Sequence, residues 1–82
     1  MLAVETFPIS KIYVPAKRRK SLDTDTVNEI AESIMEKGQL TPILLRHGDE
    51  RFVLVEGLHR LEACKALGEE TIKGMIVQPR RH

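Results

Sequence analysis

The sequence predicts a small α+β domain with the element order strand, basic loop, helix, hairpin, helix, strand. Three observations support this fold class. Residues 27–35 place apolar side chains at helical spacing, residues 43–55 contain two apolar runs joined by a Gly/Asp turn, and residues 58–67 form a second helical segment after a glycine. The chain has 82 residues, so we expect a single domain over residues 1–82 with its core over about 4–78.

The opening segment, residues 4–14, is predicted to be extended and to be interrupted by Pro8. Residues 15–21 follow with the sequence Pro-Ala-Lys-Arg-Arg-Lys-Ser. This stretch has no apolar periodicity, so we expect a loop. Its composition alone favours a solvated basic linker.

Residues 23–37 give the clearest helical pattern. Asp23 is the expected N-cap, although Thr26 and Glu29 have the spacing of a competing capping box. The apolar positions form one stripe that is expected to be buried, made of Val27, Ile30, Ala31, Ile34 and Met35. Gly38 stands where a helix-ending glycine belongs.

The second half of the chain reads as a hairpin, a helix and a strand. Residues 43–47 and 51–55 are the predicted hairpin strands, joined by Gly48-Asp49-Glu50. The helix over 58–67 is closed by Gly68, and the last apolar run, 72–77, is stopped by Pro79.

The composition limits the function classes. Thirteen basic and twelve acidic residues leave a net charge of +1, so bulk charge does not indicate nucleic-acid binding. One cysteine excludes an internal disulfide, and the three histidines have no metal-ligand spacing, so no metal site is expected. No apolar run could cross a membrane and no signal peptide is visible, so we expect a cytoplasmic protein.

The turn from Gly57 to Arg60 is the strongest candidate site. A glycine after a strand starts a helix whose first turn carries His59 and Arg60. Free N–H groups, the helix dipole and these two side chains would together suit an anion, above all phosphate. The alternative is that Arg60 pairs with a structural carboxylate, such as Glu56 or one on the first helix, and that His59 is an ordinary surface residue. Spacing alone leaves the two interpretations about even.

Cys64 is the single thiol of the chain. It falls in the middle of the predicted helix 58–67, on its apolar side. We therefore expect a small core residue rather than a nucleophile.

Four motifs occur in order along the chain. They are Phe7-Pro8-Ile9-Ser10-Lys11-Ile12, Ile30-Ala31-Glu32-Ser33-Ile34, Gly38-Gln39-Leu40-Thr41-Pro42-Ile43 and Leu54-Val55-Glu56-Gly57-Leu58-His59-Arg60-Leu61-Glu62-Ala63. Together they resemble the ParB/sulfiredoxin superfamily, specifically the ParB N-terminal (ParB-like nuclease) domain. The resemblance covers nearly the whole chain and implies a mixed sheet with a β-hairpin, packed against two main helices. The ParB helix-turn-helix segment is not present, so we expect either a fragment of a longer protein or a stand-alone module.

The resemblance also implies a ligand. In ParB proteins a glycine-acid-arginine-arginine turn at the corresponding helix start binds the phosphates of a cytidine nucleotide. Phosphate contacts are therefore implied for Gly57, Leu58, His59, Arg60 and Arg19. Gly38 and Gln39 are implied to border the same pocket. CTP, ATP or ADP, with Mg²⁺, is the expected ligand.

Two positions depart from the family pattern. Leu58 replaces its acidic residue and Glu62 replaces its downstream arginine, so neither cytidine specificity nor a hydrolytic cycle is implied. In sulfiredoxins the position of Leu58 holds the reductive cysteine, which Cys64 does not replace. Sulfiredoxin activity is therefore not expected.

The leading expectation is a nucleotide- or phosphate-binding regulatory domain of a bacterial or archaeal protein of plasmid or chromosome partition, or of transcription regulation. One alternative is a small-molecule phosphotransferase of the same fold, with Glu56 as its acid/base candidate; whether the chain is an enzyme stays open. The other is direct DNA binding through the basic residues Lys17, Arg18, Lys20, Arg80 and Arg81. DNA contact through additional domains or subunits, and a homodimer, are further expectations.

Overall fold

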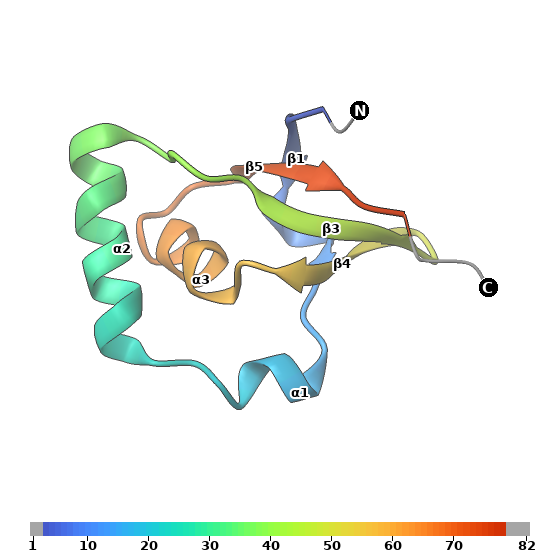
Figure 1. Cartoon of the computed structure of the whole chain (residues 1–82), viewed down its shortest axis with the longest axis horizontal. Helices are drawn as coiled ribbons and strands as arrows, with labels where there is room; N and C mark the ends of the chain where they lie inside the picture. The colour runs from blue at the N-terminus through green and yellow to red at the C-terminus, as the bar shows by residue number, and fades with distance from the viewer. Residues whose placement is uncertain (1–2, 79–82) are drawn as a thin grey trace.

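The structure is a computed structural model and describes residues 3–78 (Figure 1). Its elements are β1 (Glu5–Pro8), a 3₁₀ helix (Ile9–Lys11), β2 (Ile12–Tyr13), α1 (Ala16–Arg19), α2 (Thr24–Lys37), β3 (Ile43–Gly48), β4 (Arg51–Glu56), α3 (Leu58–Ala66) and β5 (Thr71–Ile76). They follow the expected order, with three additions near the N-terminus: the 3₁₀ helix, β2 and α1.

The strands in this part of the chain form one five-stranded mixed sheet in the order β1-β5-β3-β4-β2. β3 and β4 are the predicted antiparallel hairpin, closed where Gly48 lies opposite Arg51. β5 runs parallel to β3, β2 runs parallel to β4, and β1 pairs with β5 in antiparallel fashion. The α+β fold class with a mixed sheet is confirmed.

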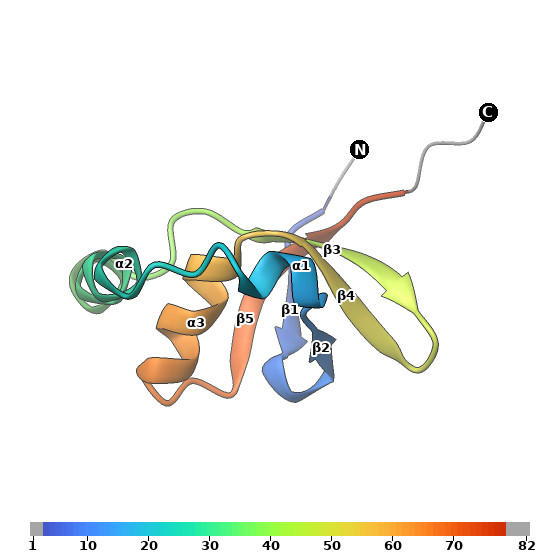
Figure 2. The same cartoon turned by 90° about the horizontal axis from the view of Figure 1, so that it is seen from below.

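The two longer helices, α3 and α2, form two layers on one side of the sheet (Figure 2). Figure 2 shows α3 between the sheet and α2. Ile43, Leu45 and Leu54 of the central strands and Leu61 of α3 are fully buried between them. The sheet thus packs directly on α3, whereas α2 packs mainly against α3 and contributes Ile34 to the edge of the core.

The expected loop over residues 15–21 was wrong at its centre, because residues 16–19 form α1. The carbonyl oxygen of Pro15 accepts hydrogen bonds from the N–H groups of Arg18 at 2.9 Å and Arg19 at 3.4 Å. Proline fixes a backbone angle that suits the start of a helix. A single turn needs no apolar stripe, so periodicity could not reveal it.

The predicted buried stripe of α2 was too wide. Val27 is buried and Ile34 packs at the core, but Met35 is 74% exposed. Because α2 touches the rest of the domain mainly through α3, its buried strip is narrow and Met35 falls outside it. No helix within residues 3–78 is long and apolar enough to cross a lipid bilayer.

Candidate functional site

Gly57 makes the turn between β4 and α3. Its backbone angles are φ 112° and ψ 29°, in a region that side chains disfavour. A Cβ atom at this position would lie 2.6 Å from Cγ2 of Ile43. The carbonyl oxygen of Gly57 accepts the N–H of Leu61 at 2.9 Å, which starts the helix. Glycine therefore allows α3 to begin directly against β3.

The first turn of α3 presents backbone N–H groups. No side chain caps the helix at Gly57, and the first turn contains no acidic residue. The first N–H groups of a helix lack intrahelical partners, and the positive end of the helix dipole lies there. This turn therefore has the local chemistry of an anion site. Leu58 can contribute only its backbone, because its side chain is 7% exposed and belongs to the core.

Arg60, in this first turn, is half-buried. It lines a cavity of about 340 Å³ together with Glu56, Thr41 and Met75. Among residues 3–78 one ion pair is formed, between Lys65 and Glu62 at 3.2 Å. Arg60 forms no ion pair with a residue in this range. The structural pair of Arg60 with Glu56, considered as the alternative to an anion site, is therefore not formed. Its guanidinium group is available for an anionic ligand.

His59 has a partner that the sequence did not suggest. Its Nε2 atom accepts the backbone N–H of Asp23 at 3.0 Å. This hydrogen bond occupies one of the two ring nitrogens of His59. His59 is thus more than an ordinary surface residue, because it joins the start of α3 to the start of α2.

Asp23 is the N-cap of α2, as predicted. Its carboxylate accepts the hydroxyl of Thr26 at 2.7 Å and the N–H of Asp25 at 3.2 Å. These two hydrogen bonds, with the Thr26 bond the stronger influence, lower the pKa of the Asp23 carboxyl. The cap fixes the backbone of Asp23, whose N–H holds His59.

Arg19 lies on the other side of the first turn of α3. At the end of α1, it lines a cavity of about 370 Å³ with Leu58, Glu62 and Lys65. Arg19 and Arg60 therefore border different cavities that are separated by the start of α3. The structure brings both close to the same turn but not to each other.

Gly38 and Gln39 line a third cavity, near Cys64 and Lys73. The side-chain amide of Gln39 is engaged there, because its Oε1 accepts the N–H of Lys73 at 2.8 Å and its Nε2 donates to the Lys73 carbonyl at 2.9 Å. The structure thus places these two residues outside the cavity of Arg60. Gln39 instead ties the link between α2 and β3 to β5.

The remaining candidates are spread over the surface. Lys17, Arg18 and Lys20 are exposed on or beside α1, whereas Arg80 and Arg81 lie outside the described residues. Glu56 is exposed at the end of β4. The described residues contain no group of three or more His, Cys, Asp or Glu side chains that could hold a metal ion.

Cys64 is 3% exposed and belongs to the core, which confirms its expected role. Burial, with a smaller effect of the charge of Glu69, raises the pKa of its thiol. It therefore has the properties of an inert core thiol.

Comparison with known proteins agrees with this fold. The family model of the ParB N-terminal domain matches residues 2–82. A probable chromosome-partitioning protein ParB from Campylobacter jejuni is 39% identical over 62 residues, which are 76% of this chain and 22% of that protein. The chain thus spans about a fifth of the length of this relative.

Two solved structures have the same fold. Sulfiredoxin from Arabidopsis thaliana matches with a TM-score of 0.83 and 32% identity, over 94% of this chain and 86% of that chain. The C-terminally truncated chromosome-partitioning protein ParB from Caulobacter crescentus, complexed with CTP-γ-S, matches with a TM-score of 0.80 and 26% identity, over 95% of this chain and 46% of that chain. On the family match, the relatives and the shared fold, this chain belongs to the ParB N-terminal domain family of the ParB/sulfiredoxin superfamily.

Proposed function

We propose that this domain binds a nucleotide through its phosphates at the start of α3 and acts as a regulatory domain of a cytoplasmic partition- or transcription-associated protein. The observation that carries the proposal is the uncapped first turn of α3 beside Arg60, a guanidinium without an ion pair within residues 3–78. The similar Caulobacter ParB structure, which contains CTP-γ-S, supports it.

The groups proposed to hold phosphate have separate roles, while His59 joins this turn to Asp23. The backbone N–H groups that follow Gly57 would hold phosphate oxygens at the positive end of the helix dipole. Arg60 would bind a phosphate with two parallel hydrogen bonds. Arg19, on the other side of the turn, would contact a second phosphate group of the same nucleotide.

Acidic side chains near the turn favour a counter-ion bound with the nucleotide. Glu56 lines the cavity of Arg60, and Glu62 lines that of Arg19. Mg²⁺ bound to the nucleotide would reduce the repulsion between these carboxylates and the phosphates. CTP, ATP and ADP, each with Mg²⁺, are the ligands to compare.

Calorimetric titration with each of the three nucleotides tests the proposal. Arg60→Gln removes a charged donor, which is worth about 1.5–3 kcal/mol, so the dissociation constant should rise about ten- to a hundredfold. Lys11→Gln is the matched control, because it removes the same charge from an exposed site on the 3₁₀ helix. If Arg60→Gln binds as well as the native chain does, phosphate is not held at this turn.

A phosphotransferase of the same fold is the second candidate, since Glu56 lines the same cavity as Arg60. It predicts nucleotide consumption in the presence of one member of a metabolite panel, and loss of turnover with retained binding in Glu56→Gln. Nucleotide binding without consumption would leave the regulatory function.

We do not propose sulfiredoxin chemistry for this chain. Where sulfiredoxins have their reductive cysteine, this chain has Leu58, whose side chain is buried. The cysteine of this chain, Cys64, is enclosed in the core.

DNA contact and homodimerisation stay predictions. Lys17 on α1 and Lys20 directly after it are exposed, where they could meet a DNA backbone. Binding through them should weaken steeply as salt is added.

A further inference from the structure

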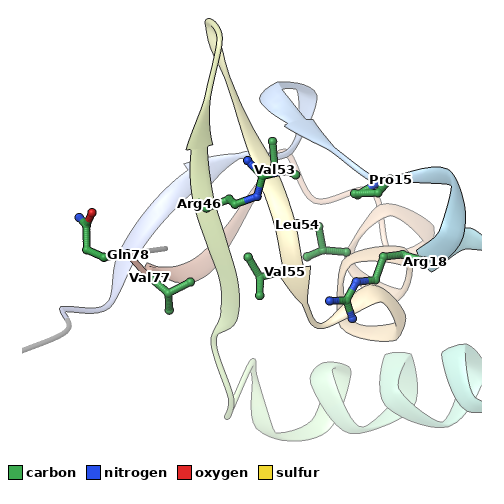
Figure 3. Close-up of a pocket in the computed structure, with 8 residues that line it drawn as sticks. All are labelled: Pro15, Arg18, Arg46, Val53, Leu54, Val55, Val77 and Gln78. Atoms are coloured by element: carbon green, nitrogen blue, oxygen red, sulfur yellow. The ribbon is translucent and has the colours of Figure 1, made fainter. Parts of the chain in front are cut away.

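The sheet has a second face, on the side away from α3, that carries aliphatic side chains. Side chains alternate along a strand, so Val53 and Val55 lie on the face opposite the buried core position of Leu54. With Pro15, Leu54 and Val77 they line a cavity of about 360 Å³, in which Val53 is only 5% exposed and Val55 and Val77 are partly exposed. In Figure 3, Val55 lies between the ribbons of β3 and β4. This cavity is separate from those beside the start of α3.

The edge of the sheet beside this cavity is only partly covered. β2 pairs with Phe52 and Val53 alone, so β4 has no strand partner on that side beyond Val53 among the described residues. The pairing of β3 with β4 shifts at this point: Leu45 lies opposite Leu54, but Leu44 lies opposite Glu56. Val55 is therefore the extra residue of a β-bulge. Bulges of this kind are common where a strand borders a binding site.

Two arginines border the aliphatic floor. Figure 3 shows Arg46 extending from β3 toward Val53 and Arg18 extending from α1, with Leu54 and Val55 between the two arginines in this view. Neither arginine forms an ion pair within residues 3–78, and no acidic residue lines the cavity. The cavity therefore combines an apolar floor with two uncompensated positive charges.

This combination selects the chemistry of a ligand. No aromatic residue lines the cavity, so it offers a nucleobase nothing to stack on. An aliphatic floor also differs from nucleic-acid interfaces, which are polar and strongly basic. Carboxylates pair with guanidinium groups through two parallel hydrogen bonds, and an aliphatic side chain gains from burial on valines.

We propose that this cavity is the docking site for an acidic peptide segment of a partner protein. Carboxylates of the segment bind Arg18 and Arg46, and a leucine or isoleucine between them packs on the partly exposed Val55 and Val77. The open edge of β4 allows the segment to lie extended beside the sheet. This cavity has a different lining from the two beside the start of α3, although Arg18 adjoins Arg19 on α1.

A fluorescein-labelled peptide of sequence Asp-Glu-Leu-Leu-Asp-Glu is the probe, followed by fluorescence anisotropy at low ionic strength. Replacing both arginines, Arg18→Glu with Arg46→Glu, should weaken binding by about tenfold or more. The matched control is Lys11→Glu with Lys37→Glu, which changes the net charge equally at exposed sites outside the cavity and should bind as the native chain does. A peptide with lysine in place of each acid should bind the double arginine variant better than the native chain.

A second measurement needs no variant. On adding the probe to the native chain, the methyl signals of Val53, Val55 and Val77 should shift, whereas those of core residue Leu61 should not. An equal loss of affinity in the lysine control would overturn the proposal, since bulk charge alone would then explain binding. The proposal would also be overturned if the valine methyl signals did not change, or if a peptide with alanine in place of leucine bound with equal affinity. Equally effective competition by glutarate or by double-stranded DNA would overturn it as well.

Discussion

Replacing Gly57 by alanine tests whether the turn before α3 is shaped as described. Two costs add. At φ 112° an L-residue is held in the left-handed region, which costs roughly 1–2 kcal/mol. The new Cβ would also lie 2.6 Å from Cγ2 and 2.9 Å from Cβ of Ile43, and overpacking of this kind costs about 1–3 kcal/mol.

Ile43 cannot easily move away, because it is 0% exposed in a central strand of the sheet. Gly57→Ala should therefore lower the free energy of unfolding by about 2–5 kcal/mol, a large part of the roughly 5–15 kcal/mol typical of a domain. The assay is urea unfolding followed by far-ultraviolet circular dichroism.

Gly68→Ala is the matched control. Gly68 has φ 77°, but a Cβ there would meet no atom within 4 Å. It should lose only the conformational term, about 1–2 kcal/mol. The difference between the two variants then measures the contact with Ile43, and Ile43→Ala should partly relieve Gly57→Ala in a double-mutant cycle. A Gly57→Ala variant no less stable than Gly68→Ala would refute this description of the turn.

Three further predictions concern residues around the site. Hydrogen bonds lower the pKa of the Asp23 carboxyl below its ordinary value of 3.8. The ionised carboxylate therefore stabilises the fold fully above pH 3.8, and this stabilisation is lost as the pH falls through the pKa of the folded state. Asp23→Asn should flatten this part of a curve of the free energy of unfolding against pH. Burial raises the pKa of the Cys64 thiol, so iodoacetamide should modify the folded chain far more slowly than the urea-unfolded chain, and equal rates would show that the thiol is accessible. Gln39→Ala removes the hydrogen bonds to Lys73 and should lower the free energy of unfolding by about 1–2 kcal/mol, whereas Gln78→Ala, at an exposed glutamine, should have little effect in the same urea assay.

Much of the fold could be predicted because its main elements carry local signals. The periodic apolar residues of α2, the turn of the hairpin and the glycines that flank α3 each identify an element without knowledge of its neighbours. α1 was missed because one helical turn has no period to detect. The exposure of Met35 was missed because it depends on how α2 packs against α3, which no local pattern records.

The candidate site could be predicted only in part, for the same reason. A glycine between a strand and a helix marks the turn at Gly57 from sequence alone. The hydrogen bond from Asp23 to His59 joins residues 36 apart, and that between Gln39 and Lys73 joins residues 34 apart, so no short motif contains either pair. The sequence did not mark Arg46 as a binding residue. Its role in the proposed peptide site depends on Arg18, which lines the same cavity but is distant in sequence.

The central claim is that phosphate groups bind at the first turn of α3 with help from the basic segment at α1. The most direct measurement is a two-dimensional amide NMR titration of the native chain with CTP, ATP and ADP, each with Mg²⁺. The account predicts that at least one nucleotide shifts the signals of residues 57–61 and 17–20 before those of the rest of the domain. If none of the three moves these signals at about millimolar concentration, where binding of about 4 kcal/mol would be visible, phosphate does not bind at this turn.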